Sequence, residues 1–130
     1  MANLATVDIP RAELSGACEG EAPILDLVHL SRQTFGDHAL EIELLTLFER
    51  QAAQLAVRLA QAPGPGDSAN RMELAHMVKG SARSVGALAV AAAAEAYETA
   101  LRHGDGAQSR LCAALVAEIE AARAAILALL

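Results

Sequence analysis

The sequence predicts an all-α protein, folded as an antiparallel four-helix bundle with a short N-terminal helix or arm. Hydrophobic residues make up 54% of the 130 residues, and many of them are alanine, the strongest helix former. Aromatic residues amount to only 2%, and runs of β-branched residues, which are typical of strands, are scarce. Four segments repeat apolar residues every three or four positions, and short turns separate them. This pattern favours an antiparallel bundle.

The beginning of the chain differs in character from the rest. Residues 1–23 contain Pro10 and Pro23 together with two glycines, so we expect an arm that is partly helical or flexible. Residues 24–32 are amphipathic and predict a short helix. Gly36 and Asp37 then mark a break, with Asp37 placed to cap the helix that follows.

Four longer helices are expected in residues 38–130. The first spans residues 38–61 and ends in the sequence Ala-Pro-Gly-Pro-Gly-Asp at residues 62–67. Asp67 or Ser68 can cap the second, which runs over residues 69–85 and stops at Gly86. The third spans residues 88–102. After a turn at residues 103–106, the fourth carries apolar residues from position 111 to position 129.

Composition and charge exclude several classes of function. The formal net charge is −6, with only 10 lysines and arginines, which argues against a nucleic-acid binder and is compatible with protein partners. Cys18 and Cys112 stand alone, without metal-binding or redox spacing. The N-terminus lacks the apolar run of a signal peptide, and the apolar stretch 89–94 is too short to span a membrane. We expect a cytoplasmic monomer.

His76 is the residue with the most distinctive surroundings. An α-helix turns about 100° per residue, so the direction of each side chain can be compared with that of His76. An apolar stripe falls at roughly 160° to 240° from it, which makes this stripe the core face. It consists of Leu74, Val78, Ala82 and Val85. We therefore expect His76 to point away from the core. His29, His38 and His103 have no distinctive neighbours and are expected to be ordinary solvated residues.

The neighbours of His76 predict a phosphoryl-accepting site. Lys79 follows at i+3 and places a mobile positive charge where an anion bonded to the imidazole would lie. Gly80 follows at i+4, costs the helix about 1 kcal/mol relative to alanine, and leaves space for another surface. An exposed imidazole is substantially neutral at physiological pH, so one ring nitrogen can act as a nucleophile. No nucleotide pocket accompanies these residues.

The sequence from His76 to Ala87 resembles a known family at this point. HMVKGS at residues 76–81 and Gly86-Ala87 match, without a gap, the HxxKGSxxxxGA signature of histidine-containing phosphotransfer (HPt) domains. ILDLVHL at 24–30, TFGD at 34–37 and LLTLFERQ at 44–51 are similar to the first helices of that family. The resemblance covers residues 24–130, which are therefore expected to form an HPt-like four-helix bundle.

The resemblance implies roles for individual residues. His76 would be the phosphoacceptor, Lys79 would steady the phosphoryl group, and Gly80 would permit docking of a partner. The docking surface around Gly80 is expected to include Met72, Arg83 and Ser84. Glu98 stands where the family usually has Gln or Glu. It could orient the imidazole, although it would also repel a bound phosphate, and it could equally be a solvated helix residue. Ala82 stands at the position where many members of the family have a second serine.

The resemblance also implies a phosphorelay intermediate whose partners are a histidine kinase and response-regulator receiver domains. A receiver carries an aspartyl phosphate and a Mg²⁺ ion, His76 takes the phosphoryl group, and the reverse step passes it to another receiver. The Mg²⁺ belongs to the partner, so the chain needs no metal or other cofactor of its own and would be a carrier rather than an enzyme.

Two other interpretations remain open from the sequence. Glu73 and His76 form a Glu-x-x-His pair, the spacing used by di-metal sites in helical bundles, but no second pair exists and both residues point outward. The chain could also be a degenerate member of the HPt fold that serves only as a docking or inhibitory module for a kinase. The intact His-Lys-Gly trio argues against this, because a docking module does not need the acceptor.

Overall fold

The computed structural model describes residues 24–104 and 106–130, and all regular structure within them is helical. The all-α prediction is therefore confirmed, while the expected N-terminal arm lies outside the described residues. The helices are α2 (Leu27–Gln33), α3 (His38–Ala60), α4 (Ser68–Val85), α5 (Leu88–His103) and α6 (Gln108–Leu129). No helix among the described residues is long and apolar enough to cross a membrane.

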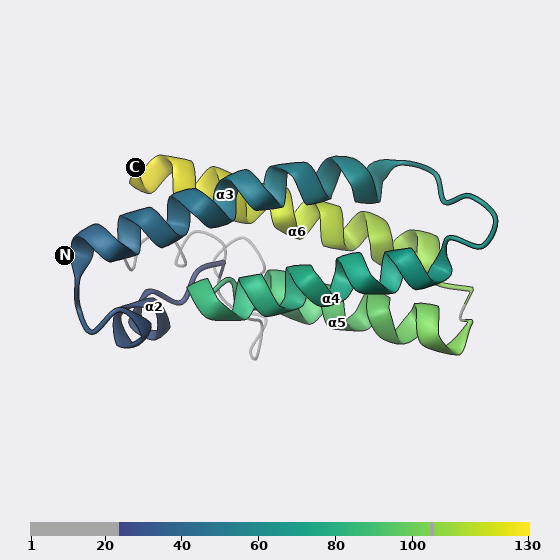
Figure 1. Ribbon diagram of the computed structural model, residues 1–130, viewed down its shortest axis with the longest axis horizontal. Helices are drawn as coiled ribbons and strands as arrows, with labels where there is room; N and C mark the ends of the chain where they lie inside the picture. Colours follow the sequence, from purple (N-terminus) through teal and green to yellow (C-terminus); the bar gives the residue numbers. More distant parts are fainter. Residues whose placement is uncertain (1–23, 105) are drawn as a thin grey trace, which may run out of the picture.

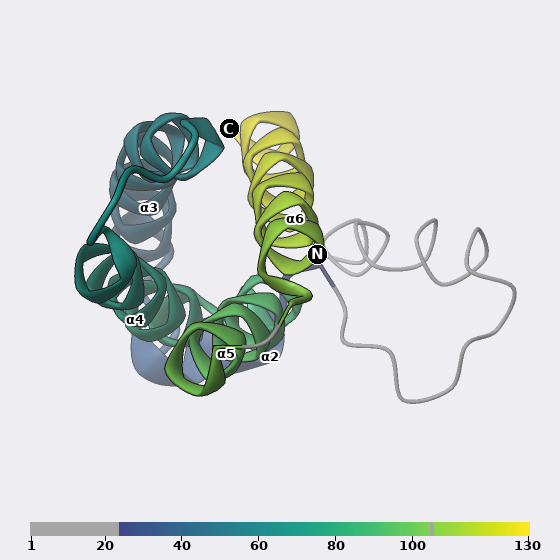
Figure 2. The same ribbon diagram turned by 90° about the vertical axis from the view of Figure 1, so that its right-hand side faces the viewer.

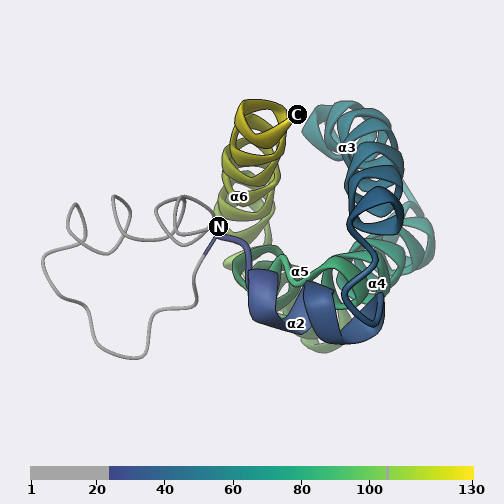
Figure 3. The ribbon, with the colours of Figure 1, turned by 90° about the vertical axis from the view of Figure 1, so that its left-hand side faces the viewer.

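The four long helices form an up-and-down bundle (Figure 1). Viewed along its axis, α3, α4, α5 and α6 follow one another around a ring, and α6 closes the ring by packing against α3 (Figure 2). The short helix α2 lies across one end of the bundle, in front of the ends of α4 and α5 in Figure 3. The core between the helices contains many buried alanines, which allow close approach of the helix backbones. Its largest fully buried side chains include Tyr97, Leu59, Leu115, Ile119 and Ile126.

The first helix begins later than expected. Residues 24–32 were predicted to be helical, but α2 starts at Leu27 because the Asp26 carboxylate accepts a hydrogen bond from the His29 amide at 3.0 Å and caps the helix. Leu25, just before this cap, is fully buried outside any helix. The predicted cap of α3 is confirmed, since the Asp37 carboxylate accepts from the Leu40 amide at 3.1 Å.

The turn between α4 and α5 is fixed by α2. Gly86 ends α4 with φ 82°, a left-handed conformation that favours glycine. Its carbonyl accepts a hydrogen bond of 2.7 Å from the Asp26 amide. The ring of His29 was expected to be simply solvated, but its Nε2 lies 2.7 Å from the carbonyl of Arg83. This contact adds a short hydrogen bond to a carbonyl in the last turn of α4, which also accepts from the Gly86 amide at 3.4 Å.

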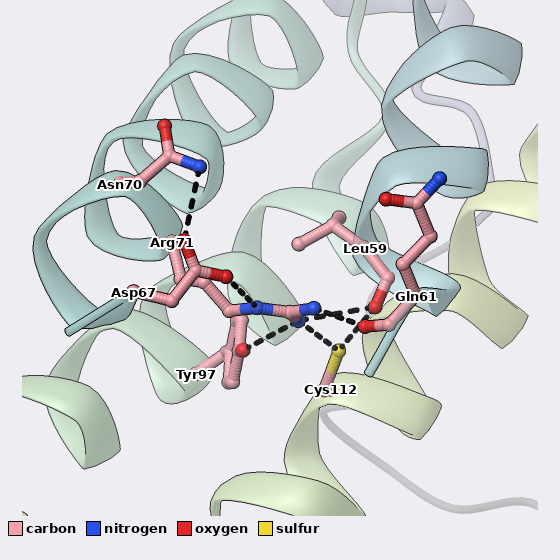
Figure 4. Close-up of polar contacts among 7 residues, drawn as sticks. All are labelled: Leu59, Gln61, Asp67, Asn70, Arg71, Tyr97 and Cys112. Carbon is pink, nitrogen blue, oxygen red and sulfur yellow. Dashed lines mark hydrogen bonds and ion pairs between the residues drawn. The ribbon is translucent and has the colours of Figure 1, made fainter. Parts of the chain in front are cut away.

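A buried arginine joins the helices at the opposite end of the bundle (Figure 4). Arg71 is only 3% exposed, and its guanidinium donates to the carbonyls of Leu59 and Gln61 at the end of α3. It also donates to the hydroxyl of Tyr97 on α5 at 3.1 Å and contacts the sulfur of Cys112 on α6 at 3.5 Å. One side chain of α4 thus contacts the three other long helices.

The loop before α4 contributes the counter-charge of Arg71. Asp67 precedes α4, as predicted, but its side chain makes no capping hydrogen bond. Instead, its carboxylate lies 3.6 Å from the Arg71 Nε. A cavity of about 560 Å³ lies beneath this loop, lined by Arg71 and Tyr97 among others, and none of the predicted site residues borders it. We infer that the role of Arg71 is to hold the helices together, since protein groups already surround its guanidinium.

Candidate functional site

His76 lies near the middle of α4 and faces solvent, as the helical periodicity predicted. Its side chain is 70% exposed. The residues assigned to the core face of the same helix are all at most 4% exposed; they are Leu74, Val78, Ala82 and Val85. The prediction that His76 points away from the core is therefore confirmed. An approaching protein can reach the ring.

The structure places Lys79 and Glu98 together beside His76. Helices α4 and α5 pack side by side, and the Nζ of Lys79 donates to the Oε1 of Glu98 at 2.8 Å. The expectation of a mobile lysine is wrong, because its side chain is only 16% exposed and is held by this ion pair. The alternative of a solvated Glu98 is also wrong, because the residue is only 8% exposed.

The pairing with Lys79 favours the charged form of Glu98. The hydrogen bond from Lys79 lowers the pKa of Glu98 below its ordinary value, against the opposing effect of burial, and the charge of His76 contributes in the same direction as Lys79. Glu98 is thus a carboxylate at neutral pH and accepts hydrogen bonds without donating any.

The second oxygen of Glu98 faces the imidazole. Its Oε2 lies 3.4 Å from the Nδ1 of His76, an ion-pair distance that is longer than an ordinary hydrogen bond. Glu98 therefore contacts Nδ1 of the ring and does not contact Nε2. An imidazole with its proton on Nδ1 has its lone pair on Nε2, where a nucleophile would be needed.

Gly80 leaves the surface next to His76 open. A Cβ atom built on Gly80 would meet nothing within 4 Å, and the residue is exposed in the middle of α4. Packing among the described residues, 24–104 and 106–130, therefore gives no reason for a glycine at this position.

The other predicted docking residues differ in their surroundings. Met72 is half-buried and packs against the core. Arg83 is exposed and forms a 3.0 Å ion pair with Glu95 of α5. The exposed Ser84 turns its hydroxyl back to the carbonyl of Ser81 at 2.8 Å.

Sequence reasoning missed two residues near His76. Met77 follows it directly and is 47% exposed, which adds an apolar side chain to this side of α4. Arg102 of α5 places its Nη2 3.4 Å from the Oε2 of Glu98. The i,i+4 spacing of Glu98 and Arg102 was a signal for this pair, but only the packing of α5 against α4 shows that it belongs to the surroundings of His76.

Metal binding finds no support in the structure of the described residues. Within residues 24–104 and 106–130, no three or more His, Cys, Asp or Glu side chains are grouped so as to hold an ion. Glu73 and His76 both lie on the exposed side of α4.

Comparison with known proteins identifies the family. A model of the Hpt domain matches residues 43–125, more than half of the chain, and this range contains α4, α5 and every predicted site residue. No curated protein and no solved structure gave a match. The family match and the all-helical bundle agree with each other, and the chain belongs to the Hpt domain family, the histidine phosphotransfer modules of phosphorelay signalling.

Proposed function

We propose that His76 is the phosphoacceptor of this Hpt domain. The observation that carries the proposal is an imidazole 70% exposed in the middle of a helix, beside the open surface at Gly80 and the ion pair of Lys79 with Glu98. His38 provides a useful contrast within the same chain. Its side chain is also 70% exposed and lies 3.5 Å from Glu41, yet no lysine or glycine accompanies it on α3.

The proposed transfer begins with His76 in its neutral form. Glu98 favours the proton on Nδ1, so the lone pair of Nε2 attacks the phosphorus of an aspartyl phosphate on a receiver domain. An N–P bond forms, the P–O bond to the aspartate breaks, and the aspartate leaves as a carboxylate. The ring keeps its Nδ1 proton and gains positive charge, which Glu98 stabilises. The partner supplies the Mg²⁺ ion, and the reverse sequence passes the phosphoryl group to another receiver.

Lys79 and Gly80 have complementary proposed roles. Lys79 lies one turn after His76 and partly neutralises the charge of the phosphoryl group, while Gly80 lets the receiver approach the ring closely. The exposed side chains of Met77 and Arg83, with the half-buried Met72, provide the mixed apolar and charged surface typical of protein interfaces. Ser84 lies at the edge of this surface with its hydroxyl engaged by its own helix.

Radiolabel transfer tests the assignment of His76. A panel of purified receiver domains, each phosphorylated with labelled acetyl phosphate, is mixed with the full chain. We expect label on the chain that is labile in acid and stable in base, as for a phosphoramidate. His76→Gln should abolish it and the matched variant His38→Gln should retain it. Undiminished labelling of His76→Gln, or no labelling of the wild type by any receiver, contradicts the proposal.

Two further variants test the neighbours of His76. Lys79→Ala should slow formation of phosphohistidine or shorten its lifetime, and an unchanged time course for both would remove Lys79 from the site. Glu98→Met, which removes both oxygens that could accept from Nδ1–H, should shift the neutral imidazole from the Nδ1–H toward the Nε2–H tautomer, which long-range ¹H–¹⁵N correlation spectra distinguish. An identical tautomer ratio in both proteins would show that Glu98 does not orient the ring.

A further inference from the structure

The carboxylate of Glu98 creates an electrostatic problem for the proposed acceptor. A phosphoryl group brings about two negative charges. Glu98 lies within 3.4 Å of the imidazole that would carry it, and Lys79 is already paired with Glu98. A site containing only these two neighbours is neutral before transfer, and the phosphoryl group then adds uncompensated negative charge beside a buried carboxylate.

Arg102 supplies a second positive charge at this carboxylate. Its Nη2 lies 3.4 Å from Oε2, the same oxygen that faces His76, whereas Lys79 binds Oε1. Glu98 thus contacts a lysine, an arginine and the acceptor histidine at once. The side chain of Arg102 is 55% exposed, so it is accessible to solvent and can adjust to a group that arrives at the ring.

We infer that Arg102 is a positioning residue for phosphotransfer, which acts through Glu98. By binding Oε2 it fixes the carboxylate in the orientation that faces Nδ1 of His76. Its charge also offsets that of Glu98, so that the incoming phosphoryl group meets a site with net positive charge. This inference rests on the proposed role of His76 and assigns Arg102 a part in the same site.

A structural role for Arg102 would have a different origin. The residue lies in the last turn of α5, where any cation interacts favourably with the helix dipole. That interaction does not depend on Glu98, whereas the inferred role does. A double-mutant cycle therefore separates the two roles.

The test measures transfer rate and phosphohistidine half-life in Arg102→Gln, Arg102→Lys, Glu98→Gln and the double variant Arg102→Gln/Glu98→Gln. Arg102→Gln should slow transfer or shorten the half-life by about two- to fivefold, the range for a partly exposed charge pair. Arg102→Lys should restore most of the loss. In the Glu98→Gln background, Arg102→Gln should have little further effect. Arg50→Gln on α3 makes the same change in charge away from α5 and should behave as wild type.

The outcomes distinguish this inference from the proposed function. If His76→Gln abolishes labelling and Arg102→Gln transfers like wild type, His76 remains the acceptor and the role of Arg102 is overturned. An equal loss from Arg102→Gln with and without Glu98 overturns action through the carboxylate. If the wild type accepts no label from any receiver, the proposed function itself fails, and this inference fails with it.

Discussion

At the scale of single residues, the surroundings of His76 combine exposure with a fixed electrostatic environment. The imidazole is exposed, while the carboxylate and the ammonium beside it are largely buried and paired. Buried side chains lose less freedom when a partner docks, because folding has already fixed them. The proposed acceptor is thus accessible, and the two charged side chains beside it are held in place.

Two substitutions at Gly80 test its effect on stability and its effect on phosphotransfer separately. Because a Cβ there meets nothing within 4 Å, Gly80→Ala should stabilise the bundle by about 0.5–1 kcal/mol in urea denaturation. Gly80→Gln should also fold, but its bulk beside His76 should slow phosphotransfer by at least about tenfold. Normal transfer by Gly80→Gln would show that the glycine is unrelated to docking, and a less stable Gly80→Ala would contradict the open surface.

The lowered pKa of Glu98 predicts a pH-dependent contribution to stability. A carboxyl group whose pKa is lower in the folded state than its ordinary value of 4.5 stabilises the fold above that value, and loses this contribution as the pH falls through the folded pKa. The difference in free energy of unfolding between wild type and Glu98→Gln should shift against the wild type as the pH falls below about 4.5. Urea denaturation at each pH measures it, and a difference independent of pH would contradict the ion pairing.

At the scale of elements, α4 is positioned by α2 at one end and by Arg71 near the other. The carbonyls of Arg83 and Gly86 accept hydrogen bonds from α2 and its cap at 2.7 Å each. Arg71 joins the beginning of α4 to the end of α3. His76 lies between these two fixed regions, so the helix that presents it is held on both sides.

Gly86 should be intolerant of substitution for two reasons. Its φ of 82° strains any other residue, and a Cβ would lie 2.5 Å from the backbone oxygen of Asp26. Gly86→Ala should therefore cost roughly 2–4 kcal/mol in thermal or urea unfolding. Gly104→Ala is the matched control, since its φ is 64° but a Cβ there meets nothing within 4 Å, and it should cost only about 1–2 kcal/mol. Equal losses would show that the contact with α2 does not matter.

At the scale of the whole molecule, the bundle buries one contiguous core. Arg71 and Arg123 form polar contacts between its helices. Arg71 connects α3, α5 and α6 to α4 at one end. On the other side of the ring, Arg123 of α6 binds Glu49 of α3 at 2.8 Å. The hydrogen bonds that Arg123 donates to the Glu49 carboxylate raise the pKa of Arg123. These links help to set the register between helices that have many interchangeable alanine contacts.

Replacement of Arg71 should affect stability without affecting the chemistry at His76. Arg71→Met removes the guanidinium that donates to the buried hydroxyl of Tyr97 and to the carbonyl of Gln61, so we expect a loss of about 2–4 kcal/mol in chemical denaturation. Arg58→Met on the exposed side of α3 is the control, with less than about 0.5 kcal/mol. Folded Arg71→Met should still accept phosphate at a temperature below its unfolding transition, and a stable but inactive variant would contradict a purely structural Arg71.

The sequence by itself determined the helices, the core face of α4 and the outward direction of His76, because periodicity fixes the angle of each side chain about its own helix axis. It also located Lys79 and Gly80, which share that helix. Only the tertiary structure decided that Lys79 is bound, that Glu98 is buried against His76, and that Arg102 and Arg71 have the partners described above. Those contacts depend on how far each helix is rotated and shifted against its neighbours, and packing of the whole core sets these quantities.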